Sequence, residues 1–169
     1  MIELEVKGLD EVNRMLAQLP FRVGKKVIRK ATFAGAVLLR QAIKDAAPVR
    51  GGLTLKKMSK GGYRSSGFLK KNIRAKLKKR QGPHQVIYMV GPMGQAFYGK
   101  FVEEGHAAGK RKKYGRGITE ATGLRMVPAH PFIMPTFNNM TTQIITKMVD
   151  KLNEGVLKEG KALGFITSA

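Results

Sequence analysis

The segment between Pro20 and Pro48 limits the possible folds more than any other part of the chain. Apolar and small residues recur in it every three or four positions, which is the spacing of one face of an α-helix. These positions are Val27, Ala31, Ala34, Leu38 and Ala42. Because proline is disfavoured inside a helix, the two prolines bound a helix that we expect to run from about Phe21 to Ala46. A long helix with one apolar face needs a partner layer, and the small residues predict that this layer packs closely.

Alternating apolar and charged residues predict strands at two places. Near the N-terminus, Ile2–Lys7 alternate as a half-buried strand does, and Asp10–Leu19 have the pattern of a short helix. In the middle of the chain, Ile73–Lys78 form a second alternation in which every other residue is basic, and Val86–Val90 form a third. Gln81–His84 between them is rich in turn formers, so these two strands are predicted to pair as an antiparallel hairpin.

The last apolar helix follows a proline-rich segment. Pro135 suits the first position of a helix, and Gly160 suits its end. The apolar residues that follow at helical spacing are Phe137, Met140, Ile144, Ile145, Met148, Leu152 and Val156. The predicted fold class is α+β, a small antiparallel sheet packed against a long helix in the N-terminal half and a C-terminal helix. The 169 residues suit a single domain, 1–169, in which residues 51–66 and 106–126 are two long flexible basic loops.

Two aromatic segments flank the second of these loops: Ala96–His106, with the sequence AFYGKFVEEGH, and Pro128–Phe137, with the sequence PAHPFIMPTF. Aromatic residues one helical turn apart share a face, so packing is the role that we expect for them. The residues predicted to anchor the core are Phe97, Tyr98, Phe101, Phe132, Pro135 and Phe137. Two apolar anchors with a loop free to reach outward between them suit an assembly role better than a catalytic pocket.

The residue patterns of catalysis and metal binding are missing or incomplete. Gly94–Lys100 has the glycine spacing of a phosphate-binding loop, but Phe101 stands where a Ser or Thr hydroxyl would ligate magnesium. The three histidines lack the close spacing of a metal-binding pair. Glu103 and Glu104 are adjacent and diverge by about 100° on a helix, so they cannot act as a paired acid and base. We therefore predict no enzymatic activity, no metal and no cofactor.

Adjacent acids are unusual in so basic a chain. We interpret Glu103 and Glu104 as candidates for ion pairs with Lys or Arg of a neighbouring copy, and an ordinary solvated helix end is the equally open alternative. The residues predicted to lie at an interface between subunits are Glu103, Glu104, Arg50 and Leu69.

The net charge predicts a polyanionic partner. The chain has 32 Lys and Arg against 11 Asp and Glu, a formal charge of +21. No base-reading motif is present, so the charge indicates contact with a phosphate backbone. The residues predicted to face DNA or a partner ring are Lys56, Lys57, Lys60, Lys110, Arg111, Lys112 and Lys113. The basic faces of the long helix are as well explained by ordinary solvation, and no apolar run approaches the ~20 residues of a membrane span.

Several short motifs follow one another along the chain in a characteristic order. In chain order they are Gly8-Leu9-Asp10, Ala47-Pro48-Val49-Arg50, Gly67-x-Leu69, Val90-Gly91-Pro92, Phe97–His106 and Pro128–Pro135. This order resembles the neck, or tail-completion, family of long-tailed bacteriophages, whose members join head to tail and are also described as minor tail components. The resemblance covers nearly the whole chain. Residues 51–65 depart from it, because in that family the motifs on either side follow one another almost directly.

The resemblance implies a non-enzymatic virion protein that forms a ring in the phage neck and joins the DNA-filled head to the tail. The implied neighbours are the head-closure protein and the tail-terminator or tail-tube protein. The implied assembly is a homo-oligomeric ring, expected to be a hexamer, with the genome passing through its lumen and touching it through nonspecific backbone contacts. The implied location is the virion, after assembly in the host cytoplasm, with no membrane contact. Two alternatives stay open, a tail-terminator ring protein and a basic protein that binds nucleic acid nonspecifically.

Overall fold

The structure is a computed structural model that describes residues 21–49, 56–57, 63–79, 82, 85–114 and 117–163. The predicted strand Ile2–Lys7 and helix Asp10–Leu19 lie outside this part of the chain. The chain forms two compact units, which are described separately below. Unit 1 comprises Met1–Ala42, Ala75–Val90 and Asn139–Ala169, and unit 2 comprises Ile43–Arg74 and Gly91–Asn138.

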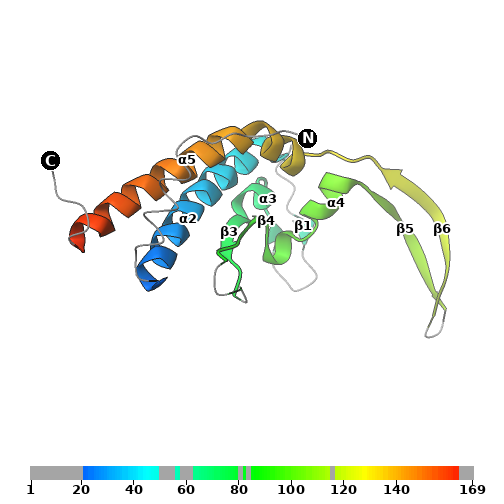
Figure 1. The fold of residues 1–169 in the computed structure, drawn as a ribbon. Helices are drawn as coiled ribbons and strands as arrows, with labels where there is room; N and C mark the ends of the chain where they lie inside the picture. Colours follow the sequence, from blue (N-terminus) through cyan, green and yellow to red (C-terminus); the bar gives the residue numbers. More distant parts are fainter. Residues whose placement is uncertain are drawn as a thin grey trace. The chain divides into compact units, whose positions relative to one another are not determined.

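Two long helices dominate unit 1. Helix α2 spans Phe21–Ala46 and helix α5 spans Ile133–Ala162, and their unit 1 portions lie side by side (Figure 1). The predicted range of α2 is therefore confirmed. Helix α5 begins two residues before Pro135, the predicted first residue, and runs past Gly160.

Close packing joins the two helices within unit 1. Val27 of α2 and Val156 of α5 are buried to 1% and 2% exposure, and Leu152 packs against them. Gly155 brings the backbone of α5 so near to α2 that an added Cβ would lie 2.7 Å from Cγ1 of Val27. Gly35 plays the same part on α2, facing the side chain of Met148. The close approach predicted from small residues is thus present, and glycines on both helices produce it.

A two-stranded sheet completes the predicted α+β architecture. Strand β3 spans Ile73–Leu77 and strand β4 spans Tyr88–Pro92, and the two pair with each other. The Lys78 N–H donates to the Ile87 carbonyl at 2.9 Å, which extends the pairing beyond β3. The ring of Tyr88 packs on Phe33 of α2 with centroids 5.4 Å apart. The predicted hairpin and the predicted fold class are both confirmed.

Unit 2 consists of short elements and has a small core of its own. They are β1 (Lys56–Lys57), β2 (Tyr63–Arg64), α3 (Phe68–Lys71), η1 (Gly94–Ala96) and α4 (Gly99–Glu104). The core of this unit contains Ile43, Ile73, Leu69 and Ala96, each at most 5% exposed. Gly99 allows α4 to pack here, because an added Cβ would lie 2.5 Å from Cγ of Pro92 and 2.9 Å from Cδ1 of Leu69.

Unit 2 also contains a long antiparallel hairpin that follows α4 directly (Figure 1). Strand β5 spans His106–Tyr114 and strand β6 spans Gly117–Val127, with His106 opposite Val127 at the base. The sequence predicted a loop without regular structure for residues 106–126, and that prediction is wrong. Strand β5 consists largely of basic and small residues, so it lacks the apolar alternation from which a strand is predicted.

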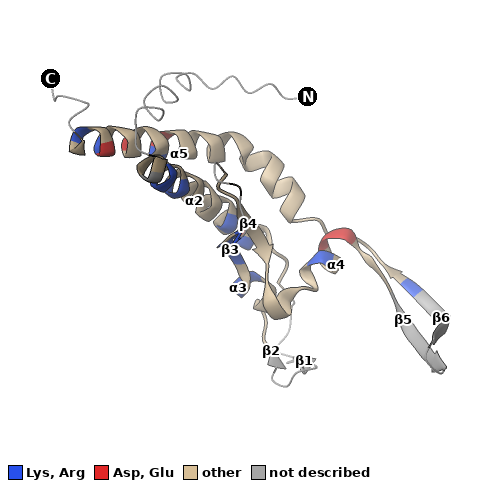
Figure 2. Cartoon of the chain, turned by 60° about the horizontal axis from the view of Figure 1, so that its bottom comes forward, with Lys and Arg blue, Asp and Glu red and all other residues tan. Residues whose placement is uncertain are grey.

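The described helices do not include one with both the length and the apolar character that a bilayer crossing demands. Charge is unevenly distributed over the elements. In Figure 2 the acidic end of α4 stands where β5 begins, whereas α2 and β3 carry basic residues.

Candidate functional site

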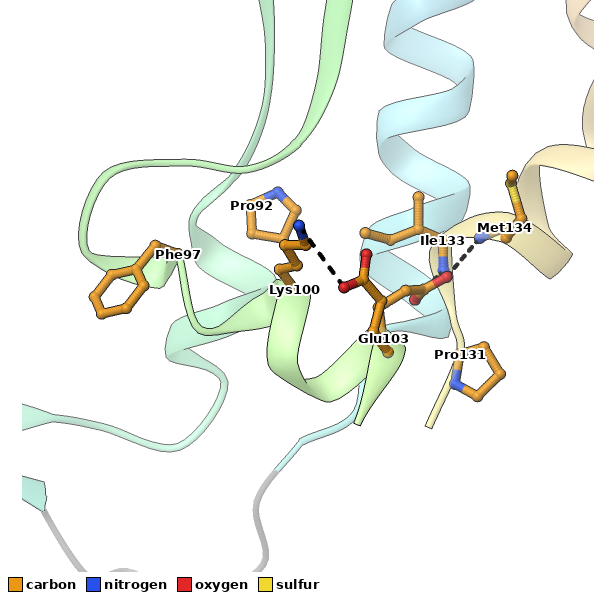
Figure 3. A pocket seen from close by; sticks show the side chains of 8 residues that line it. Pro92, Phe97, Lys100, Glu103, Pro131, Ile133 and Met134 are labelled. Carbon is orange, nitrogen blue, oxygen red and sulfur yellow. Dashed lines mark hydrogen bonds and ion pairs between the residues drawn. The ribbon is translucent and has the colours of Figure 1, made fainter. Parts of the chain in front are cut away.

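The side chain of Glu103 joins the end of α4 to the start of α5. Its Oε2 accepts hydrogen bonds from the backbone N–H groups of Phe132 at 2.7 Å and Ile133 at 2.9 Å. Its Oε1 accepts one from the N–H of Met134 at 2.9 Å (Figure 3). The first four N–H groups of a helix have no partner within the helix. Counted from Phe132, the residue before α5, the first three of these N–H groups bind Glu103, and the next residue is Pro135, which has no N–H. One carboxylate and one proline therefore satisfy the whole N-terminus of α5.

The electrostatics of this contact favour the ionised carboxylate. The N-terminus of a helix carries partial positive charge, which stabilises an anion placed there. Partial burial acts to raise the pKa of Glu103, but the hydrogen bonds from Met134, Phe132 and Ile133 outweigh that effect. The net result is a pKa below the ordinary value of 4.5, so Glu103 is charged at neutral pH.

Two backbone features reinforce the same junction. The His130 N–H donates to the Val102 carbonyl at 2.8 Å, a second link between α4 and the segment that leads into α5. Gly105 ends α4 with φ 73°, in the left-handed region that favours glycine. An added Cβ at Gly105 would lie 2.8 Å from the carbonyl oxygen of Val127. We call the set of Val102, Glu103, Gly105, His130 and Phe132–Met134 the α4–α5 clamp.

The clamp closes the base of the β5–β6 hairpin. The hairpin leaves α4 at His106 and returns at Val127, which are opposite each other in the strand register. The ring of His106 also lies 5.4 Å from that of Phe101, centroid to centroid. Both ends of the hairpin are thus tied to the same short stretch of unit 2.

A groove of about 530 Å³ lies beside the clamp. It is lined by Pro92, Phe97, Lys100, Glu103, Glu104, Pro131, Ile133 and Met134. Figure 3 shows Phe97 on one side and Ile133 with Met134 on the other. Phe97 is 62% exposed and Met134 is 63% exposed, so the groove has apolar edges open to solvent.

The predicted core anchors divide into two groups. Phe132 is 4% exposed and belongs to the core of unit 2. Phe97, Phe101 and Phe137 are 62%, 45% and 43% exposed, so the prediction that they anchor the core is wrong for these three. The reason is that α4 packs inward through Gly99, its one buried residue, and leaves its aromatic side on the surface.

The aromatic residues of α4 and the turn before it pack on each other instead. The rings of Phe97 and Phe101 meet edge to face, with centroids 6.3 Å apart. Tyr98 is partly buried, and Pro135 is exposed at the third position of α5. Residue spacing correctly predicted that the aromatics share one side of the helix, but it could not predict which side faces the core.

The predicted interface residues also divide. Glu103 was expected to pair with a neighbouring copy, but its carboxylate is occupied by three N–H groups of its own chain. Leu69 is 5% exposed and packs next to Gly99, so it offers almost no surface to a partner. Glu104 is accessible, with a side chain 61% exposed and 3.8 Å from the ammonium of Lys100. Arg50 lies outside the described residues.

The predicted DNA-facing residues are described only in part. The backbone of Lys56 and Lys57 forms β1, and that of Lys110–Lys113 forms part of β5. Lys60 lies outside the described residues. Within the described ranges, His, Asp and Glu do not gather into a group of three that could ligate a metal ion.

The capping role of Glu103 was the functional feature that sequence reasoning missed. One signal was available. The residue before α5 is Phe132, which has no side-chain oxygen and cannot cap a helix itself. A helix without a local cap needs an acceptor from elsewhere, and acids are scarce in this chain.

A family model of phage proteins matches the chain. The family model described as "Bacteriophage HK97-gp10, putative tail-component" matches residues 10–105, which is more than half of the 169-residue chain. The matched range ends at Gly105, immediately before β5. No curated protein matches the chain, and no solved structure does.

Proposed function

Because the chain belongs to the HK97-gp10-like family of phage tail components, we propose that it is a structural subunit of the phage neck. In this proposal the 169 residues act as one joining domain without enzymatic activity. Copies assemble into a ring, a hexamer in the simplest case, between a head-closure protein and a tail-terminator or tail-tube protein. The genome passes through the lumen of that ring.

The observation that carries the proposal is the α4–α5 clamp. In the clamp, the charged side chain of Glu103 and the left-handed Gly105 hold the base of a hairpin in one position. Such an arrangement suits a part that must contact a neighbour in a fixed orientation, and it contributes no pocket with paired catalytic groups. Structural precision at the base of a projecting element is what an assembly protein needs.

Exposed apolar residues near the clamp supply surface for subunit contacts. Phe97, Phe101, Met126, Met134 and Phe137 of unit 2 are between 43% and 72% exposed. Of these, Phe97 and Met134 line the groove, and exposed apolar residues that line a groove mark interaction sites more often than scattered ones do. Aromatic residues and Met are also the types enriched in interfaces. A ring of identical copies would bury these residues at each joint.

The net charge of +21 favours a second candidate, a free basic protein that binds nucleic acid nonspecifically. A tail-terminator ring is a third candidate of the same structural class as the first. The candidates differ in what happens when the chain is absent from the particle. A missing neck subunit should leave filled heads and separate tails, whereas a missing tail terminator should alter the tails themselves.

Negative-stain microscopy of particles made without this chain tests the proposal. We expect filled heads and tails of normal length that are not joined, with joining restored by the wild-type chain. The double variant Phe97→Ser and Met134→Ser should restore joining poorly when it replaces the wild-type chain. Both substitutions remove apolar side chains that are more than 60% exposed at the edges of the groove. Leu157→Ser, a 45% exposed position in unit 1, is the matched control. Normal particles without the chain would contradict a neck role.

A further inference from the structure

We propose that the β5–β6 hairpin is an arm that binds the phosphate backbone of double-stranded DNA. This inference rests on the proposed function for the identity of the polyanion, because a neck subunit meets the packaged genome. It goes further by assigning DNA contact to one element of the chain.

The dimensions of the hairpin suit an arm. Strand β5 has 9 residues and β6 has 11. At about 3.3 Å per residue, the shorter strand is roughly 30 Å long. Among the described strands, β5 and β6 pair only with each other, so both outer edges of the ribbon are open. An isolated two-stranded hairpin is marginally stable in water, so a partner that binds it would also stabilise it.

The base of the arm is fixed by the α4–α5 clamp. Glu103, Gly105 and the Val102–His130 hydrogen bond hold the residues on both sides of the hairpin. Two register shifts, between Ala108 and Lys110 and between Lys112 and Lys113, interrupt the ladder. Such bulges increase strand twist, and a twisted ribbon can follow the curvature of a nucleic-acid groove. The major groove of B-DNA admits a two-stranded ribbon.

Charge selects the partner. Residues 106–127 contain six basic residues against a single acid, Glu120. The basic residues are Lys110, Arg111, Lys112, Lys113, Arg116 and Arg125. Glu120 stands opposite Lys112 in the register, which leaves the basic excess on the rest of the hairpin. Protein hot spots are built from clustered Trp, Tyr and Arg in apolar surroundings, and this hairpin has Tyr114 as its single aromatic residue.

The geometry sets the size of the expected effect. Double-stranded DNA carries one charge per about 1.7 Å of axis, so a 30 Å arm lies within reach of more phosphates than it has cations. Each phosphate contact makes the slope of log K against log salt steeper by about 0.9. Four basic residues on β5 should therefore account for up to about 3.6 units of slope.

Salt-dependent binding of a random-sequence duplex by the purified full chain tests the assignment. The hairpin variant carries Lys110→Gln, Arg111→Gln, Lys112→Gln and Lys113→Gln. The matched control carries Lys30→Gln, Lys147→Gln, Lys158→Gln and Lys161→Gln, four exposed residues of α2 and α5 in unit 1. Both variants lose the same net charge. We expect the slope to become less steep by about 2–3.6 units in the hairpin variant and by less than about 1 in the control.

Equal slopes in the two variants would overturn the inference, since net charge and not the arm would then govern binding. Loss of self-association with DNA binding intact would also overturn it, and would identify the arm as a protein contact. A measurement on the wild-type chain guards against misfolding of the variant. With DNA bound, acetylation of Lys110, Lys112 and Lys113 should slow at least threefold relative to Lys147. Equal rates at the four lysines would contradict the proposal.

The particle experiment separates this inference from the proposed function. If particles made with the hairpin variant join normally while its DNA slope is unchanged, the arm assignment fails and the neck role stands. If particles made without the chain are normal but the hairpin slope effect appears, the neck role fails and the arm remains a DNA-binding element.

Discussion

At the residue scale, Glu103 is the side chain on which most of the candidate site depends. We expect Glu103→Gln to lower the free energy of unfolding by about 2 kcal/mol, within the range of a lost helix cap. Both carboxylate oxygens accept N–H groups, and Gln replaces one of them with an NH₂ donor. At least one N–H of the first turn of α5 is then left without an acceptor. Urea unfolding followed by circular dichroism measures the change.

The neighbouring Glu104 provides the control for that substitution. Its side chain is 61% exposed, and its ion pair with Lys100 spans 3.8 Å at the surface. Exposed pairs of this kind contribute less than about 1 kcal/mol, so Glu104→Gln should change stability by no more than about 0.5 kcal/mol. Equal effects of the two substitutions would show that the loss reflects general charge and not the cap.

The same contact predicts a dependence of stability on pH. Hydrogen bonding holds the pKa of folded Glu103 below 4.5, so the unfolded chain binds the proton more tightly. The stabilisation is therefore complete above pH 4.5 and is lost as the pH falls through the lower folded pKa. The stability difference between wild type and Glu103→Gln should be full at pH 7 and should shrink towards pH 3. If wild type and Glu103→Gln differed in stability by the same amount at pH 7 and pH 3, the charge of the carboxylate would not be the cause of the stabilisation.

The contact between Glu103 and Phe132 could not be predicted from the sequence. Glu103 and Phe132 are 29 positions apart, and no local pattern connects an acid at the end of one helix with the start of another. The motifs around both residues were recognised, and the contact between them was not. Likewise, the aromatics at 97 and 101 were grouped correctly by helical spacing, but the buried face of α4 is set by Gly99. A glycine leaves no mark on a hydrophobicity pattern.

At the element scale, the packing of α5 on α2 within unit 1 depends on two glycines with unlike neighbours. An added Cβ at Gly155 would meet Cγ1 of Val27 at 2.7 Å, and Val27 is 1% exposed with a stiff branched side chain. We expect Gly155→Ala to be destabilising by about 1–2 kcal/mol, because overpacking outweighs the gain in helix propensity of about 1 kcal/mol.

Gly35→Ala on α2 is the comparison for Gly155→Ala on α5. Its Cβ would lie 2.6 Å from Cγ and 2.8 Å from Sδ of Met148, an unbranched side chain, and 3.1 Å from Cγ2 of Ile144. Met148 can adjust more readily than the branched Val27, so Gly35→Ala should cost less than Gly155→Ala, by about 1 kcal/mol. Thermal unfolding of the two variants checks the order. If Gly35→Ala lost more stability than Gly155→Ala, the contact with Val27 would not be the tightest constraint on the packing of α5 on α2.

The elements that could be predicted from sequence are those that bury a face. Helix α2 has the bounds expected from two prolines and an apolar stripe, and the predicted hairpin is present, with β4 at Tyr88–Pro92 and so two residues beyond the predicted Val86–Val90. The β5–β6 hairpin was missed for the opposite reason. Its strands are held by pairing of backbone with backbone, and such hydrogen bonds place almost no demand on residue type. Hydrophobic periodicity does not detect a strand whose residues lack apolar alternation.

At the scale of the whole molecule, repulsion among like charges opposes the compact state. The net charge of +21 is partly offset by ion pairs such as Lys26–Glu159, Lys70–Asp45, Lys100–Glu104 and Lys151–Glu154. The lysine side chains in these pairs are all at least 42% exposed, so solvent screens each pair and its contribution to stability is small. Added salt weakens these few attractions and also weakens the many repulsions. The repulsions are more numerous, so screening should stabilise the chain.

We therefore expect the Tm of the isolated chain to rise by about 3–6 °C between 10 mM and 300 mM NaCl. The Debye length falls from about 30 Å to below 10 Å over this range, which removes most repulsion between separate elements. A relief of 1–2 kcal/mol corresponds to a few degrees in a chain of this length. The variant with Lys30, Lys147, Lys158 and Lys161 changed to Gln should start from a higher Tm at low salt and rise less. A Tm that falls with salt would mean that ion pairs outweigh repulsion, and the chain would then have no electrostatic need of a polyanion or of acidic neighbours.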